Sequence, residues 1–162
     1  MSVKFSLPTR QGSPPKVGEQ PPQLQFSDQS PEEIKSALKE WAYSSIPNIR
    51  EHDTLISVKS TRAMWLDETI EPAHADVFMP PQGSREFCHF HFDGSLHAVV
   101  SHEVEEEIIK SGWGLRHPWH DRGVKEIMIY APRDEEELAI TKQLVIQSYQ
   151  YATGDTTTEI EL

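Results

Sequence analysis

The sequence predicts an α+β domain: a mostly antiparallel sheet with helices packed on one face. Its 162 residues match the usual length of one domain. Apolar residues at helical spacing mark a helix near each end, with short strand-like segments between them. Asp93 and Gly94 stand between two apolar runs, a pattern typical of a hairpin.

The first helix is expected to begin at Ser30. Ser30 can cap it, Pro31 suits its first turn and Glu33 completes a capping box. The apolar residues that follow recur at helical spacing: Ile34, Ala37, Leu38, Trp41 and Ala42.

Strands are expected at residues 54–60 and 71–79, from their alternating or β-prone residues. Residues 86–92 and 95–100 form the two arms of the hairpin, and residues 125–131 form a further strand.

Two more helices have capping signals. Ser101 can cap a short helix over residues 102–110. Asp134 and Glu137 form a capping box that opens a long helix reaching about residue 152.

The two ends of the chain differ from its middle. Residues 1–29 hold five of the 12 prolines, which favours extended backbone. We expect the second half of this segment to lie on the domain as an arm. Residues 30–154 form the domain, and residues 155–162 form a flexible tail.

Charge and cysteine content exclude several classes of protein. The net charge is −11, from 15 basic and 26 acidic residues, which argues against nucleic-acid binding and against docking on anionic membranes. Cys88 is the single cysteine, so no intrachain disulfide forms. Without a signal peptide or an apolar span, we expect a soluble cytoplasmic protein that takes a small-molecule substrate. The sequence leaves a homodimer open.

Histidines are concentrated in the middle of the chain, where seven of the eight lie between residues 74 and 120. His89 and His91 are two residues apart on one strand, so they share a face of the sheet. Imidazole nitrogens are ligands for zinc, iron or copper. An alternative is that these rings are exposed or bonded to backbone carbonyls.

The length of the turn decides whether His97 joins this pair. A two-residue loop at positions 93–94 places His97 opposite Phe90, on the other face, whereas a three-residue loop at 93–95 places it opposite His91. Asp93 in the turn could add a carboxylate ligand, although a turn aspartate more often bonds its own backbone.

The segment "GWGLRHPWH" (112–120) predicts a rigid loop with several chemically useful side chains. They are Trp113, Arg116, His117, Trp119 and His120. An aromatic wall, a cation and a titratable base suit an anionic or phenolic ligand. The alternative is that the tryptophans belong to the core and Arg116 pairs with a nearby acid. Tyr130 and Arg133, between a strand end and a helix start, could also face a site.

Three blocks together resemble the fungal-luciferase-like domain family: "DGSLH" (93–97), "GWGLRHP" (112–118) and "IYAPRDEEEL" (129–138). "LPTRQGSPP" (7–15) and "HADVFM" (74–79) fit more loosely. The residues at family-like positions are His74, His89, Asp93, His97, Arg116 and His117. His91 lies outside the pattern, which favours pairing His89 with His97.

The resemblance implies an enzyme of secondary metabolism. Fungal luciferase adds dioxygen to a hydroxylated styrylpyrone, so a base must deprotonate an enol or phenol. His97 or His117 would be that base, and Arg116 would hold the enolate oxygen. Alternatively, His89, His97 and His117 would bind a single iron, zinc or copper ion. The expected substrate-binding residues are His74, His91, Asp93, Trp113, Trp119, Tyr130 and Arg133.

Other functions remain open on this resemblance. The same base could serve a cofactor-free cyclisation, isomerisation or decarboxylation of a polyketide- or terpenoid-like compound. The domain could also be a non-catalytic module that binds a small molecule or a metal. Luminous enzymes of the family carry an N-terminal membrane segment that this chain is expected to lack, so light emission is not implied.

Overall fold

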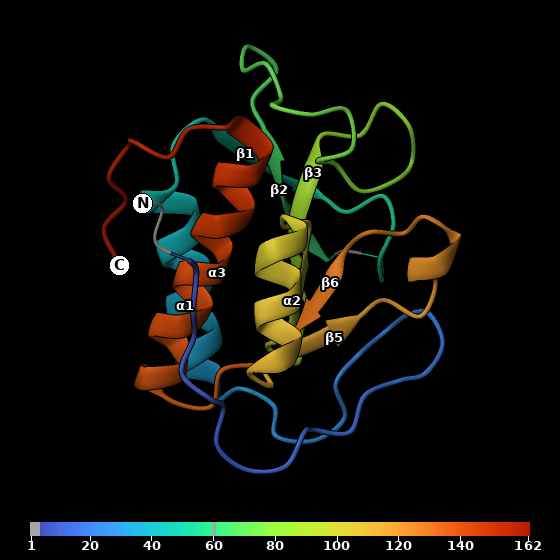
Figure 1. The fold of residues 1–162 in the computed structure, drawn as a ribbon, viewed down its shortest axis with the longest axis vertical. Coiled ribbons are helices and arrows are strands. Elements are labelled where there is room, and N and C mark those ends of the chain that lie inside the picture. The colour runs from blue at the N-terminus through green and yellow to red at the C-terminus, as the bar shows by residue number, and fades with distance from the viewer. Residues whose placement is uncertain (1–3, 60) are drawn as a thin grey trace.

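The computed structural model describes residues 4–59 and 61–162. Within them one antiparallel sheet has six strands in the order β1-β2-β3-β4-β6-β5 (Figure 1). The strands are β1 (Ile49–Asp53), β2 (Arg62–Leu66), β3 (Glu86–Phe90), β4 (Leu96–Ala98), β5 (Gly114–Arg116) and β6 (Ile127–Ile129). The helices are α1 (Glu32–Ser45), α2 (His102–Lys110) and α3 (Glu135–Thr153), with a short 3₁₀ turn, η1 (His120–Arg122). The predicted α+β class is confirmed.

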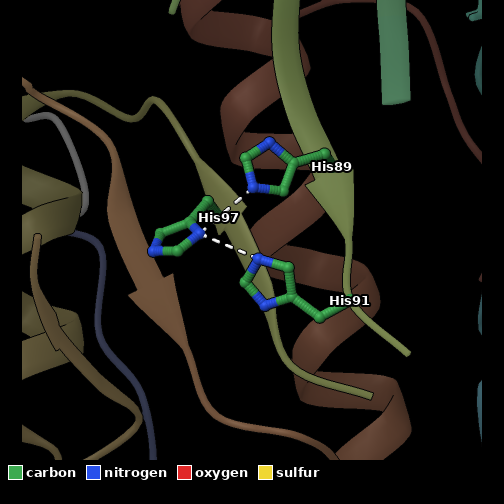
Figure 2. Close-up of side chains that lie close together, drawn as sticks. All are labelled: His89, His91 and His97. Atoms are coloured by element: carbon green, nitrogen blue, oxygen red, sulfur yellow. Dashed lines mark hydrogen bonds between the residues drawn. The ribbon is translucent and has the colours of Figure 1, made fainter. Parts of the chain in front are cut away.

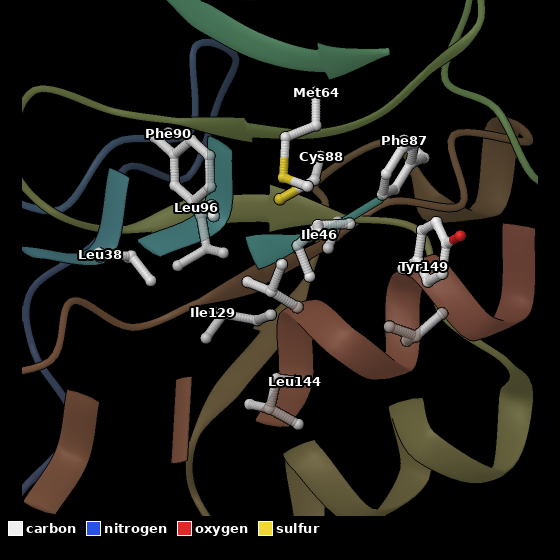
Figure 3. Close-up of a cluster of buried hydrophobic side chains, with 14 of the residues drawn as sticks. Leu38, Ile46, Met64, Phe87, Cys88, Phe90, Leu96, Ile129, Leu144 and Tyr149 are labelled. Carbon is white, nitrogen blue, oxygen red and sulfur yellow. The ribbon is translucent and has the colours of Figure 1, made fainter. Parts of the chain in front are cut away.

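The main apolar core lies between the three helices and one face of the sheet (Figure 3). Leu38 of α1, Ile108 of α2 and Leu144 of α3 are buried there. Alternate strand residues meet them: Cys88, Phe90, Leu96, Ala98, Ile127 and Ile129. Because side chains alternate along a strand, His89 and His97 lie on the opposite face. No helix in the described ranges is long and apolar enough to cross a membrane.

The helix starts follow the predicted capping chemistry at two of three places. Ser101 accepts a hydrogen bond from the Val104 amide at 3.3 Å, and Asp134 accepts one from the Glu137 amide at 2.9 Å. The predicted Ser30 cap is wrong. The Ser30 hydroxyl donates to the carbonyl of Pro132 at 2.6 Å, so it ties the helix start to the strand end instead.

Two predicted strands are also wrong. Residues 54–59 form the turn between β1 and β2, closed by the Thr54 amide bonding the Thr61 carbonyl at 2.9 Å; position 60 lies outside the described residues. Residues 71–79 are a chain of bends. Residues 71–79 bury Val77 and Met79 outside any strand, whereas none of residues 54–59 is buried.

β5 replaces part of the predicted rigid loop. Gly114 approaches β6 so closely that a Cβ there would lie 2.0 Å from the carbonyl oxygen of Met128. A glycine at this position therefore permits the edge strand to pair with β6. The sequence predicts a turn at this glycine, because glycine is common in turns.

The hairpin has a register that neither predicted loop describes. His89 pairs with His97, and the His91 amide donates to the Ser95 carbonyl at 2.8 Å. The loop therefore consists of Phe92, Asp93 and Gly94, one residue earlier than the three-residue alternative. His89 and His97 share a face under this register.

The proline-rich N-terminal segment lies along the sheet. A bridge between Val17 and Gln25 folds it back on itself, and it runs past β5 in Figure 1. The Gln23 side chain donates to the carbonyl of Arg116 at 3.1 Å, and the Gln25 amide donates to Asp93 at 2.9 Å. This segment thereby closes over the histidine-bearing face that the helices leave uncovered.

Candidate functional site

A β-bulge in β3 prepares the site. Trp65 of β2 pairs with Glu86, whereas Met64 pairs with Cys88, so Phe87 is the extra residue. The bulge shifts the alternation by one position, and Glu86 comes to the same face as His89. The Glu86 Oε2 atom lies 2.6 Å from Nδ1 of His89, and both side chains are fully buried.

The ring of His89 converges with the imidazole rings of His91 and His97 (Figure 2). Nδ1 of His97 lies 3.1 Å from Nε2 of His89 and 3.1 Å from Nε2 of His91. All three rings are buried, with at most 2% of each residue exposed. Their facing nitrogens lie within 4.8 Å of one another, a spacing at which they could hold a metal ion.

Each ring is fixed through its other nitrogen. Nδ1 of His89 faces the Glu86 carboxylate, and Nε2 of His97 faces the Gln23 side-chain oxygen at 2.8 Å. Nδ1 of His91 lies 2.8 Å from the hydroxyl of Ser95. That hydroxyl donates its single proton to Asp93 at 2.5 Å, so it accepts from His91.

These contacts assign the tautomers. A carboxylate, an amide oxygen and an accepting hydroxyl each require an N–H on the ring that faces them. The three inner nitrogens of His89, His91 and His97 therefore direct lone pairs at one another. Such an arrangement can hold a cation at its centre, either a metal ion or a shared proton.

Burial disfavours the charged form of two of these rings. It lowers the pKa of His91 and of His97 well below the usual value, and the neighbouring rings add to the effect. Burial also lowers the pKa of His117. Neutral imidazole is the form that binds metals.

A second carboxylate stands next to the three rings. Oε1 of Glu126 lies 3.8 Å from Nδ1 of His97 and 3.9 Å from Nε2 of His117. Its other oxygen, Oε2, is buried and lacks a hydrogen-bond partner among the described residues. Burial raises the pKa of Glu126 to about 7.

His117 joins the edge of the cluster. Its ring centroid is 5.6 Å from that of His97, and its Nδ1 accepts a hydrogen bond from the Trp119 amide at 3.0 Å. The proton of the neutral ring is therefore on Nε2, facing Glu126. With 8% exposed it is the most exposed of these four rings, and it lies edge-on to the half-exposed indole of Trp119.

The structure does not bring Arg116 or His74 to the cluster. The guanidinium of Arg116 pairs with Glu105 at 2.6 Å and Glu106 at 2.7 Å, and only its backbone carbonyl contacts the arm near the site. His74 is exposed and stacks near Tyr151 with ring centroids 5.3 Å apart.

Three other predicted residues lie at a separate place. Trp113 and Arg133 line a surface cavity of about 600 Å³ at the start of α3. The Trp113 indole donates to the Pro8 carbonyl at 2.6 Å, and Arg133 pairs with Glu137. Tyr130 is buried against the guanidinium of Arg10, at 5.2 Å.

Sequence reasoning missed four residues that complete the cluster: Gln23, Glu86, Ser95 and Glu126. The sequence already placed Ser95 in the hairpin, two positions after Asp93. The other three had no signal, because a bulge, an N-terminal segment and a distant strand bring them in, and no spacing rule connects them to the histidines.

Comparison with known proteins supports the resemblance. Residues 84–148 match the family described as the Luciferase domain; this stretch includes the three ring-bearing positions 89, 91 and 97 and also Glu126. The chain is 31% identical over 170 residues to a luciferase of Armillaria mellea, and 29% identical over 168 residues to one of Neonothopanus nambi. The resemblance to the luciferase family is confirmed.

The alignments cover 92% of this chain and 62% of each of these two luciferases. A shorter alignment with a luciferase of Armillaria gallica reaches 36% identity over 91 residues. No solved structure matches the chain.

Proposed function

From its similarity to proteins named luciferase, we propose that this chain is an oxygenase-like enzyme acting on a small, enolisable aromatic compound. The observation that carries the proposal is the buried polar cluster on the helix-free face of the sheet. Buried charged and titratable groups cost stability unless they are paired and hydrogen-bonded, and groups with perturbed pKa values concentrate at functional sites.

The substrate is expected to enter beside Trp119. Its indole is 41% exposed and stands next to His117, so a planar ligand could stack on it while its enol or phenol oxygen faces the imidazole. The lone pair of neutral His117 is on Nδ1, so the ring would take the substrate's proton there, after Nδ1 releases the Trp119 amide. The imidazolium that forms keeps its Nε2–H toward the Glu126 carboxylate, which stabilises the new charge. The guanidinium of Arg116 is paired with Glu105 and Glu106. We therefore do not propose an arginine as the group that holds the enolate oxygen.

A second candidate function is a non-catalytic module that binds a small molecule or a metal. One observation favours it: Gln23 of the arm bonds His97 directly, so in this conformation the arm covers the cluster. An enzyme with this structure needs the arm or the segment from 117 to 124 to open for each turnover.

The test is dioxygen uptake with a panel of hydroxylated pyrones and related enolisable aromatics. We expect consumption of dioxygen with at least one compound, with His117→Gln slowing turnover by about 100-fold or more. His102→Gln is the control, because this exposed ring pairs with Glu106 on the surface. Photon counting in the same assay asks separately whether light is emitted. Dioxygen uptake that is equal in His117→Gln and wild type contradicts the role of His117, and binding of a compound without turnover favours the module.

A further inference from the structure

We propose that this chain binds one divalent first-row transition-metal ion through four ligands: His89, His91, His97 and Glu126. The inference goes beyond the proposed reaction, since a metal could serve catalysis, storage or structure.

The nitrogen spacing fits a common ion. Two nitrogens each about 2.1 Å from the same ion lie roughly 3.0 to 3.4 Å apart at octahedral and tetrahedral angles. The two inner contacts of His97, with His89 and with His91, are both 3.1 Å. Two neutral imidazoles with facing lone pairs repel each other at this distance, and a shared cation removes the repulsion.

The outer contacts match those of metal-binding histidines. A ligating histidine usually donates its other N–H to a carboxylate, a carbonyl or a similar acceptor, which fixes its orientation and raises its basicity. Glu86, Ser95 and Gln23 supply one acceptor to each ring. Three rings fixed separately, with their free nitrogens aimed at one point, form a site built before its ion arrives.

Glu126 supplies the fourth ligand by moving toward the three rings, because the ligand atoms already within 4.8 Å of one another are those of the three histidines. It is 3% exposed, one of its oxygens has no partner within the described residues, and the other lies 3.8 Å from the inner nitrogen of His97. A buried carboxylate with a free oxygen is costly unless a cation compensates it. His117 lies on its other side, where its Nε2–H can orient a ligating carboxylate.

The donor set selects the metal class. Three imidazoles and one carboxylate suit Fe²⁺, Mn²⁺, Zn²⁺ or Co²⁺. Soft Cu⁺ prefers sulfur, and Cys88 lies on the helix side of the sheet, in the apolar core. The site thus takes a divalent ion of borderline hardness.

The experiment treats the full chain with a chelator to remove bound metal and then titrates it with Co²⁺. Binding is followed by the visible absorption of Co²⁺, and competition with Zn²⁺ gives the affinity. We expect one equivalent to bind. Glu126→Gln, which keeps the shape of the side chain, should weaken binding by about 10-fold or more and alter the cobalt spectrum. His97→Ala should abolish binding, and circular dichroism confirms that each variant is folded.

Glu105→Gln is the matched control. Glu105 is also a carboxylate near an imidazole, with Oε1 3.1 Å from Nε2 of His120, but it belongs to the ion pairs of Arg116 on another surface. It should leave cobalt binding unchanged. Folded wild type that takes up no Co²⁺ or Zn²⁺ overturns the site and assigns the central charge to a proton. Unchanged affinity and spectrum in Glu126→Gln overturn the fourth ligand. Neither result depends on dioxygen uptake, so the proposed reaction is judged separately.

Discussion

The side-chain oxygen of Gln23 lies 2.8 Å from Nε2 of His97, although 74 positions separate the two residues in the chain. The contact holds the His97 proton on the outer nitrogen and leaves the inner nitrogen free. A proline-rich segment that precedes the first helix thus sets the chemical state of a ring at the centre of the sheet.

Replacing Gln23 tests this contact. Gln23→Leu removes the acceptor, so we expect Co²⁺ affinity to fall by about 10- to 100-fold. Gln23→Glu is the control, because it keeps an acceptor for His97 and loses only the N–H that bonds the Arg116 carbonyl; it should bind Co²⁺ more tightly than the leucine variant. Equal affinity in the leucine variant and the wild type would show that the arm does not orient His97. The measurement is competition with a chelator of known affinity.

Replacing Arg116 should affect stability more than the metal site. Arg116→Gln removes two ion pairs of a side chain that is 38% exposed, and solvent screening limits the loss to about 1 kcal/mol of unfolding free energy. Urea unfolding measures that change, and cobalt titration should match the wild type. A large loss of cobalt affinity would mean that Arg116 reaches the cluster after all.

Gly94 provides a test of the hairpin loop. Its φ is +98°, and a Cβ there would lie 2.2 Å from the Ser30 hydroxyl oxygen. We expect Gly94→Ala to lower the unfolding free energy by about 2–4 kcal/mol, from backbone strain and overpacking together. Gly123 is the control. It has a similar φ of +93° but open space in the described structure, so Gly123→Ala should cost only about 1 kcal/mol. If both variants lose the same unfolding free energy, the loss in Gly94→Ala comes from backbone strain alone and not from overpacking against Ser30.

Acid should loosen the start of the arm. Glu107 accepts hydrogen bonds from the Leu7 amide and the Ser111 hydroxyl, both at 2.9 Å, and these bonds lower its pKa. A lowered folded-state pKa stabilises the fold above the unfolded value of about 4.3, and this contribution disappears as the pH falls through the folded value. The protection factor of the Leu7 amide, which compares its exchange with the intrinsic rate at the same pH, should therefore fall below about pH 4. Glu107→Gln should already exchange faster at neutral pH; unchanged protection would disprove the tether.

The helices could be predicted because their signals are local. Asp134 and Ser101 cap the helices that the sequence assigned to them, and apolar spacing gave α1 within two residues. The strands were harder. β1 is exposed and polar at four of five positions, so it has no apolar alternation, while β5 exists only because β6 pairs with it.

The site was predictable in its histidines and not in its acids. The Asp93-Gly94 turn predicted that His89 and His97 lie on adjacent strands. The register of the hairpin then decided that their side chains share a face. Glu86 required a bulge that nothing in the local sequence marks, and Glu126 required knowledge that β6 lies next to β4. His91, which the family pattern left aside, belongs to the converging rings because it shares a face with His89 and a three-residue loop brings His97 to that face.

The three converging histidines lie within nine consecutive residues, on one tight hairpin. Closing so short a loop takes far less than a millisecond in an unfolded chain, so the hairpin can present its imidazoles before the arm and β6 arrive. An ion captured at that stage also binds the unfolded chain, and its stabilising effect on the native state is reduced by that affinity. If the chain binds the proposed ion, metal supply during synthesis would then influence how the chain folds as well as what the finished protein contains.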